Sequence, residues 1–167
     1  MGNKGLILSD AQVRQKIKRI AYEIYENNFQ EKDIILAGIQ EQGYELARLL
    51  LEELQQIASF KTTLIGVRLD KFAPTQSEIS LDCDVSVVKN KCIILIDDVM
   101  NTGRTMAYSL KPFLNVKVKK IETAVLVNRS HTQFPISIQY TGYELATTIK
   151  EHVEVQLEND RKAVYLQ

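Results

Sequence analysis

The stretch from Cys92 to Thr105 constrains the fold of this chain most strongly, and it reads CIILIDDVMNTGRT. Its first five residues are apolar, which is typical of a strand buried on both faces of a sheet. Two carboxylates, Asp97 and Asp98, follow directly, and a short turn leads into Thr-Gly-Arg-Thr and a helical pattern. Ligands of open α/β sheets bind at the carboxyl ends of the strands. A helix that begins there offers unpaired N–H groups and a positive dipole end to a phosphate.

Predicted strands and helices alternate along most of the chain. The expected elements are a helix capped by Ser9 or Asp10 and ending near Asn27, a strand at 33–37, a helix at 44–57, strands at 62–69 and 81–88, a helix at about 105–114 and a strand at 121–127. Such alternation favours an α/β fold with a mostly parallel, twisted sheet flanked by helices on both faces. After residue 129, β-prone pieces at 136–138 and 153–155 break the rhythm. A smaller antiparallel subregion is expected there.

Size and charge limit the classes of function. The chain has 167 residues, of which 45% are hydrophobic, so one domain spanning 1–167 with a real core is expected. Its formal net charge is zero, so no overall field attracts nucleic acid or an anionic membrane. No apolar run suits a signal peptide or a membrane span, which predicts a cytoplasmic protein without a membrane partner. Cys83 and Cys92 form no CxxC pair, and Cys92 is expected to be a packed thiol.

The adjacent carboxylates of Asp97 and Asp98 indicate a ligand. Like charges raise each other's pKa, so placing them together costs free energy that a bound partner offsets. The vicinal hydroxyls of a ribose donate hydrogen bonds to carboxylates, and a divalent cation is the other natural partner. Thr102, Gly103 and Thr105 suit a phosphate, because glycine permits close backbone approach and the hydroxyls add donors. One short segment therefore suits a sugar that carries a phosphate.

The same stretch resembles the phosphoribosyl-diphosphate (PRPP) binding motif of the type I phosphoribosyltransferases. In that family the acidic pair holds the ribose hydroxyls, so the resemblance implies that Asp97 and Asp98 are the catalytic acids and meet Mg²⁺ indirectly, through ribose or water. The loop that holds the 5′-phosphate would comprise Asn101, Thr102, Gly103, Arg104 (through its backbone) and Thr105. The implied reaction transfers the phosphoribosyl group of PRPP to a nucleobase, with Mg²⁺, and releases pyrophosphate.

The resemblance extends over most of the chain. DIILAGIQEQGYELARLL and LVNRSHTQFPISIQYTGYEL are similar to segments of the bifunctional pyrimidine-operon regulators that are also uracil phosphoribosyltransferases. An Arg-x-His followed by Pro-Ile in that family is echoed by Arg129, Ser130, His131, Pro135 and Ile136. Uracil is therefore the favoured base and a purine the alternative. Similar proteins usually pair, so a homodimer that binds PRPP and a nucleobase or nucleoside monophosphate is expected.

Three positions bear on the base. Tyr143 follows a glycine, as does an aromatic residue that stacks on the base in hypoxanthine-guanine phosphoribosyltransferases; packing within the hood is the alternative. Asn128 takes the place of a base-reading lysine of those enzymes, and its amide can donate to a base carbonyl. Asn101 stands where they have an Asp that accepts a proton from the purine. Because Asn cannot be a general base, a 6-oxopurine is disfavoured.

The loop after the strand predicted at 33–37 departs from the family. It is expected to bind pyrophosphate and comprises Ile39, Gln40, Glu41, Gln42 and Gly43. The family usually has a basic residue there, whereas this loop contains no Lys or Arg and Glu41 adds a negative charge. Backbone N–H groups or Mg²⁺ would then have to hold the anion. A homologue that binds PRPP or nucleotide but turns over little is an open alternative.

The lid, the hood and the basic clusters complete the expectations. Residues 70–88 correspond to the catalytic lid of the family, with Lys71 as its anion contact or as a solvated lysine, and the hood lies mainly at 129–167. Two clusters suit RNA phosphates or a solvated surface: Lys16, Lys18 and Arg19, and Lys117, Lys119 and Lys120. The resemblance to the pyrimidine-operon regulators implies an RNA-binding regulator that senses nucleotides as the alternative function.

Overall fold

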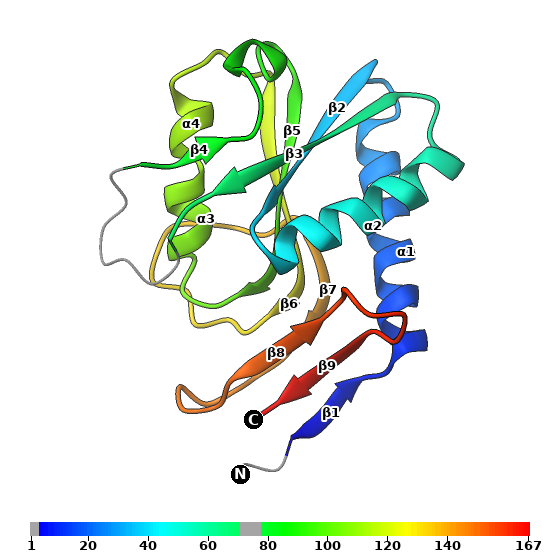
Figure 1. The fold of residues 1–167 in the computed structure, drawn as a ribbon, viewed down its shortest axis with the longest axis vertical. Coiled ribbons are helices and arrows are strands. Elements are labelled where there is room, and N and C mark those ends of the chain that lie inside the picture. The colour runs from blue at the N-terminus through cyan, green and yellow to red at the C-terminus, as the bar shows by residue number, and fades with distance from the viewer. Residues whose placement is uncertain (1–3, 71–77) are drawn as a thin grey trace.

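The computed structural model describes residues 4–70 and 78–167, and two sheets organise them (Figure 1). The strands of the main sheet are β2 (Asp33–Ile39), β3 (Lys61–Arg68), β4 (Ser80–Leu81), β5 (Cys92–Met100), β6 (Lys120–Asn128) and β7 (Tyr140–Glu144). They lie in the order β4-β3-β2-β5-β6-β7. All neighbours pair in parallel except β3 and β4. The expected mostly parallel α/β sheet is confirmed.

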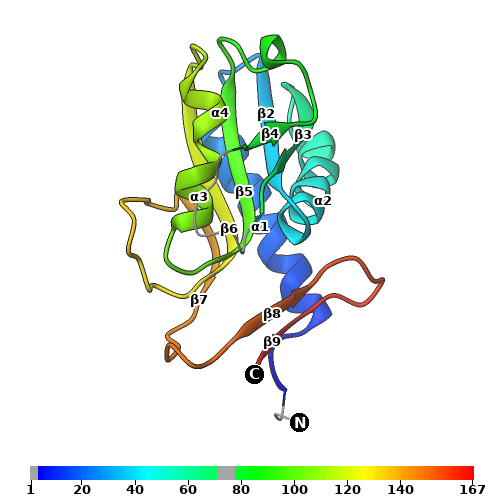
Figure 2. The same ribbon diagram turned by 60° about the vertical axis from the view of Figure 1, so that its left-hand side comes forward.

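Helices cover both faces of the main sheet (Figures 1 and 2). The helices are α1 (Asp10–Asn28), α2 (Gln42–Ile57), α3 (Arg104–Ser109) and α4 (Lys111–Leu114). Ser9 caps α1 as expected: its hydroxyl accepts from the backbone of Gln12, whose side chain accepts from the Ser9 backbone at 2.9 Å. Such caps stabilise a helix by about 1 kcal/mol. None of the helices in the described part of the chain is long and apolar enough to cross a membrane.

The apolar run of β5 joins two hydrophobic cores. Ile94 and Ile96 pack with α1 and α2, whereas Ile93 and Leu95 pack with the residues of α3 and α4 on the other face. All four side chains are fully buried. Because successive strand residues point to opposite faces, only a continuous apolar run satisfies both cores.

The helix expected at about 105–114 is divided into α3 and α4, which meet at Leu110. Pro112 lies at the start of α4. A proline in the interior of a helix removes one backbone donor and clashes with the preceding turn, whereas the first turn tolerates it. The longer helix was therefore a wrong prediction.

The strand expected at 81–88 is also wrong. Of the described residues 78–88, only Ser80 and Leu81 pair with β3, and a single 3₁₀ turn, η1, occupies Val85–Val87. The carboxylate of Asp84 caps this turn by accepting from the Ser86 backbone N–H at 2.8 Å. A short capped turn therefore replaces the predicted pairing.

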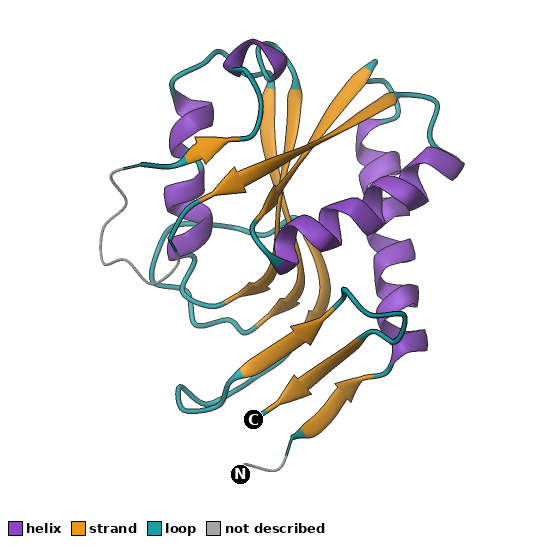
Figure 3. Cartoon of the chain, viewed as in Figure 1, coloured by secondary structure: helices purple, strands orange, loops and turns teal. Residues whose placement is uncertain are grey.

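A second, antiparallel sheet lies beyond the carboxyl ends of the main strands (Figure 3). It comprises β1 (Gly5–Leu8), β8 (Val153–Gln156) and β9 (Ala163–Leu166), in the order β1-β9-β8. The β-prone piece at 153–155 is a strand as expected, but the piece at 136–138 is not. The segment of β7 extends the main sheet instead of joining this subregion. The hood therefore also includes the start of the chain, which the sequence pattern did not predict.

Candidate active site

The two acids lie near the carboxyl end of β5. Asp97 is 2% exposed, and its Oδ1 accepts from the backbone N–H of Asp98, which is partly exposed, at 2.9 Å. Successive strand residues alternate between the two faces, so the two carboxyl groups leave the strand in different directions. Asp97 lines a hollow at the strand end that it shares with the 101–105 loop. The acids and the loop are therefore close in space as well as in sequence.

The 101–105 loop turns at Gly103, whose φ of +88° is a conformation that side chains with a Cβ rarely adopt. A Cβ there would also lie 2.9 Å from the Cε atom of Met100. The Thr102 hydroxyl accepts from the Arg104 backbone N–H at 3.2 Å, and the Arg104 guanidinium carbon lies 5.4 Å from the Tyr108 ring centroid. The small hollow inside this loop, about 40 Å³, is the Thr-Gly hollow: Asp97, Val99, Met100, Asn101, Thr102, Gly103, Arg104, Thr105 and Met106 line it.

The 39–43 loop reaches the acids through its last residue. A Cβ on Gly43 would lie 2.8 Å from the Ile96 carbonyl oxygen and 2.9 Å from Oδ1 of Asp97. Glycine at this position therefore allows the start of α2 to touch the end of β5. The peptide bond between Gln40 and Glu41 is cis, and the Gln40 N–H donates to the Val67 carbonyl at 3.1 Å.

The surroundings of the 39–43 loop are acidic. A hollow of about 280 Å³, the glutamate hollow, is lined by Gln40, Glu41, Tyr44, Glu45 and Glu158. Ile39 is buried in the core. The side-chain oxygen of Gln42 accepts from the Leu157 backbone N–H of the hood at 3.2 Å. Glu158, also from the hood, adds a second carboxylate beside that of Glu41. The negative charge near this loop, which the sequence already indicated as unfavourable for binding an anion, is therefore larger.

Arg129 occupies the centre of the site, although the sequence had identified it only within the family-like Arg-x-His. It is 8% exposed and follows β6. Its backbone N–H donates to Met100 on β5 at 2.9 Å. Its guanidinium donates to the hood: Nε to Oγ1 of Thr147 at 2.9 Å, and Nη2 to the carbonyls of Thr148 at 3.0 Å and Glu151 at 2.5 Å. The same residue thus ties the hood to the strand ends.

The guanidinium of Arg129 also holds the 101–105 loop, because Nη1 donates to Oδ1 of Asn101 at 2.8 Å. Next to this contact lies a hollow of about 320 Å³, the Arg129 hollow, lined by Asn101, Thr102, Arg129, His131, Thr132, Gln133 and Ile149. Asn101 lines both this hollow and the Thr-Gly hollow. A flat molecule in the Arg129 hollow would therefore lie beside a phosphate group in the other.

The other two candidate base-binding residues differ in placement. Asn128 is the partner of Met100 in the sheet, so it lies at the same edge, and its side-chain oxygen accepts from the Ser130 N–H at 2.9 Å. Tyr143 packs against the core beneath α1, with Nζ of Lys16 5.9 Å from its ring centroid, and it lines neither hollow. Ile149, which the sequence did not single out, provides an apolar side chain at the Arg129 hollow.

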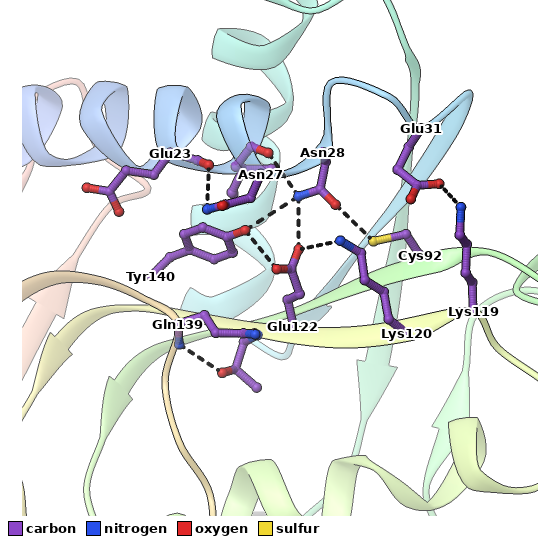
Figure 4. Close-up of polar contacts among 12 residues, drawn as sticks. Glu23, Asn27, Asn28, Glu31, Cys92, Lys119, Lys120, Glu122, Gln139 and Tyr140 are labelled. Atoms are coloured by element: carbon purple, nitrogen blue, oxygen red, sulfur yellow. Dashed lines mark hydrogen bonds and ion pairs between the residues drawn. The ribbon is translucent and has the colours of Figure 1, made fainter.

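A separate polar cluster lies at the opposite end of the sheet (Figure 4). Glu122 on β6 is buried and accepts from Asn28 at 2.9 Å and from the Tyr140 hydroxyl at 3.0 Å. The Cys92 thiol donates to Asn28 at 3.3 Å, and burial raises the pKa of this thiol to about 11. Burial, with the Glu122 carboxylate next to it, also raises the pKa of Tyr140. Cys92 is thus the packed thiol that was expected, and the cluster anchors α1 to the sheet.

The remaining predicted contacts lie elsewhere. Lys71 is outside the described residues. In the basic clusters, Lys119 pairs with Glu31 at 2.7 Å and Arg19 with Glu23 at 2.5 Å, which reduces the charge available to RNA. Within the described residues, no group of three or more His, Cys, Asp or Glu side chains converges to hold a metal ion.

Comparison with known proteins decides the family. Residues 6–160 match the model of the phosphoribosyl transferase domain. The chain belongs to the phosphoribosyltransferase family. The sequence expectation of a PRPP-dependent phosphoribosyltransferase is thereby confirmed.

Relatives of similar length support this membership of the phosphoribosyltransferase family. A Bifunctional protein PyrR from Bacillus pumilus is 35% identical over 178 aligned positions, which cover 99% of each chain. The proteins of that name from Clostridium novyi and Bacillus subtilis are 37% and 33% identical, covering 92% and 99% of this chain and 90% and 98% of theirs.

Solved phosphoribosyltransferase structures share the fold. A hypoxanthine-guanine phosphoribosyltransferase from Bacillus anthracis superposes with a TM-score of 0.73 at 16% identity, covering 87% of this chain and 84% of that one. A hypoxanthine phosphoribosyltransferase from Trypanosoma cruzi gives 0.72 at 13% identity, covering 86% and 81%.

Proposed function

We propose that this protein transfers the phosphoribosyl group of PRPP to uracil and releases pyrophosphate. The observation that carries the proposal is the convergence of three parts at one sheet edge: the acids of β5, the Thr-Gly hollow and the Arg129 hollow. The identity to proteins named Bifunctional protein PyrR over nearly the full length supports uracil as the base. A homodimer in the cytoplasm is part of the same proposal.

The described residues suggest how transfer is promoted. Asp97 and Asp98 accept hydrogen bonds from the ribose hydroxyls, and the backbone N–H groups and hydroxyls of Thr102 to Thr105 hold the 5′-phosphate. Positive charge develops on the sugar as the pyrophosphate leaves, and the buried carboxylate of Asp97 stabilises it. The adjoining hollow positions the base for attack on the same carbon. No covalent intermediate with the protein is required.

Mg²⁺ fits this site only in company with PRPP. Two acids at a strand end are too few to enclose the ion, but Mg²⁺ commonly keeps several waters and binds substrate phosphates with one or two carboxylates. Asp97 and Asp98 would therefore contact it through ribose or water. When bound, Mg²⁺ neutralises charge on the departing pyrophosphate, a contribution that the acidic 39–43 loop does not make.

Transferase activity is tested by incubating the protein with PRPP, Mg²⁺ and each common nucleobase and detecting nucleotide. Wild type is expected to convert uracil best, and Asp98→Asn to lose most of that activity. Glu26→Gln, an exposed acid-to-amide change on α1, is the matched control and should retain it. Failure of wild type to form nucleotide from any base would refute the proposal.

Binding with little turnover is a second candidate, and the glutamate hollow favours it. Glu41 and Glu158 repel pyrophosphate, whereas the third carboxylate, Glu45, is paired with Arg48. This repulsion weakens the binding of PRPP more than that of a nucleoside monophosphate. Calorimetry separates the two candidates. Uridine monophosphate binding without pyrophosphate release from PRPP supports the binding protein, whereas release at each turnover supports the transferase.

RNA binding is the remaining candidate, and it rests on the similarity to relatives named bifunctional. A mobility shift that weakens with added salt and changes with uridine nucleotides would support it. The absence of any shift at low salt would count against it.

A further inference from the structure

The guanidinium of Arg129 is a buried charge with neutral partners. Its contacts in the described part of the chain are to a hydroxyl, an amide oxygen and two backbone carbonyls, and none is to a carboxylate. Buried charges are usually paired with an opposite charge. This one instead lines the Arg129 hollow, which therefore has a positive wall.

The contact with Arg129 fixes the orientation of Asn101. A guanidinium can only donate, so the oxygen of Asn101 has to face Arg129 and the amide Nδ2 has to point away from it. The Asn101 side chain is exposed and lines the Arg129 hollow. The four hydrogen bonds of the guanidinium use four of its five N–H groups, leaving the second N–H of Nη1. We call Nδ2 of Asn101 and this N–H the donor corner.

We propose that the donor corner binds an oxo group of the incoming base and stabilises the negative charge that the base acquires on losing its ring N–H proton. This inference rests on the proposed transferase function. It assigns Asn101 as the residue that selects the base and Arg129 as its positioning residue. The substrate class is a base whose oxo group is conjugated to an acidic ring N–H, and an amino group, itself a donor, is rejected.

The transfer does not need a carboxylate at position 101 to accept the proton. The ring N–H proton passes to water, and the nitrogen lone pair forms the new bond to C1′ of the ribose. The bond from C1′ to pyrophosphate breaks and its electrons leave with the pyrophosphate. The ring charge is shared with the oxo group, where two donors and a full positive charge meet it.

Three titratable groups on neighbouring segments have contacts of their own. His131 shares the Thr147 hydroxyl with Arg129, at 3.0 Å from Nε2. The carboxylate of Glu151 accepts from the Thr148 N–H at 2.6 Å, so it is held within the hood. Asp97 borders the Thr-Gly hollow on the sugar side. None of them replaces the contact between Arg129 and Asn101.

The test compares two substitutions at Asn101. Asn101→Asp has the same shape but removes the donor and neutralises Arg129, whereas Asn101→Ala removes the donor and leaves the charge. With uracil, we expect kcat/KM to fall about tenfold or more for Asn101→Asp, a loss typical of one charge-assisted hydrogen bond, and clearly less for Asn101→Ala. All variants are compared at saturating PRPP, because Asn101 also lines the Thr-Gly hollow and its replacement is expected to raise KM for PRPP as well. In Asn101→Asp, kcat/KM should fall less for 5-fluorouracil than for uracil, because its N–H is more acidic and its anion needs less stabilisation.

Loss of folding should not account for the difference between the two Asn101 variants. The new carboxylate of Asn101→Asp pairs with Arg129, so its melting temperature should not fall below that of wild type. Equal losses in Asn101→Asp and Asn101→Ala, or the same loss for uracil and 5-fluorouracil, overturn the donor corner while wild type still forms nucleotide. If wild type forms none with any base, the transferase proposal itself fails.

Discussion

Replacement of Arg129 by methionine should remove the hydrogen bonds that hold the hood to the strand ends. Methionine retains much of the aliphatic volume but makes none of the four hydrogen bonds to Asn101, Thr147, Thr148 and Glu151. Hydrogen bonds from a charged group contribute about 1.5–3 kcal/mol each. Removing the buried charge recovers part of this as desolvation free energy. We therefore expect the free energy of unfolding to fall by about 3 kcal/mol.

Urea denaturation followed by circular dichroism measures this loss. With a denaturant slope of about 2 kcal/mol per M, typical of a protein of this size, the midpoint should fall by about 1.5 M. Arg48→Met is the matched control, because Arg48 is 40% exposed and pairs with Glu45 and Glu52 on the surface of α2. Exposed pairs contribute about 0–1 kcal/mol. Arg129→Lys keeps the charge but not the fork of donors, and should lie between the two. Equal midpoints for Arg129→Met and Arg48→Met would refute the structural role of Arg129.

Two further predictions concern Gly103 and Cys92. Gly103→Ala forces a side chain into a left-handed backbone conformation, so stability should fall by about 1–2 kcal/mol and KM for PRPP should rise; an unchanged KM contradicts the placement of the phosphate. The Cys92 pKa is raised from 9.0 to about 11 in the folded state, so its contribution to stability is complete below about pH 9 and is lost as pH rises to 11. Cys92→Ala should flatten that part of the pH–stability profile measured by urea denaturation, and Cys83→Ala should flatten it less, because burial also raises the pKa of Cys83 but this thiol is only partly buried.

The parts of the fold that the sequence predicts well are those determined locally. The β5 run has no polar residue until the acids, so burial on both faces was the simplest interpretation. Gly103 stands where a turn needs a positive φ, and Ser9 and Gln12 form a capping box from adjacent residues. In each case the residues that cause the structure are neighbours in the sequence.

The parts that were missed depend on distant contacts. Arg129 is central because residues 147–151 turn back onto it, and no local pattern reveals that return. β1 is four residues long and is a strand only because β9 lies beside it. The division between α3 and α4 is the exception, since Pro112 was a local signal that the helical spacing of the apolar residues obscured.

The pairing of β1 with β9 has a consequence for the order in which this protein folds. Gly5 lies opposite Leu166, so the small sheet closes a loop of nearly the whole chain, and loop-closure entropy opposes it until the rest is compact. During synthesis the parallel sheet is complete once β7 has left the ribosome, whereas the hood must wait for residue 166. We therefore expect the nascent protein to pass through an uncovered intermediate in which the strand ends are already in place.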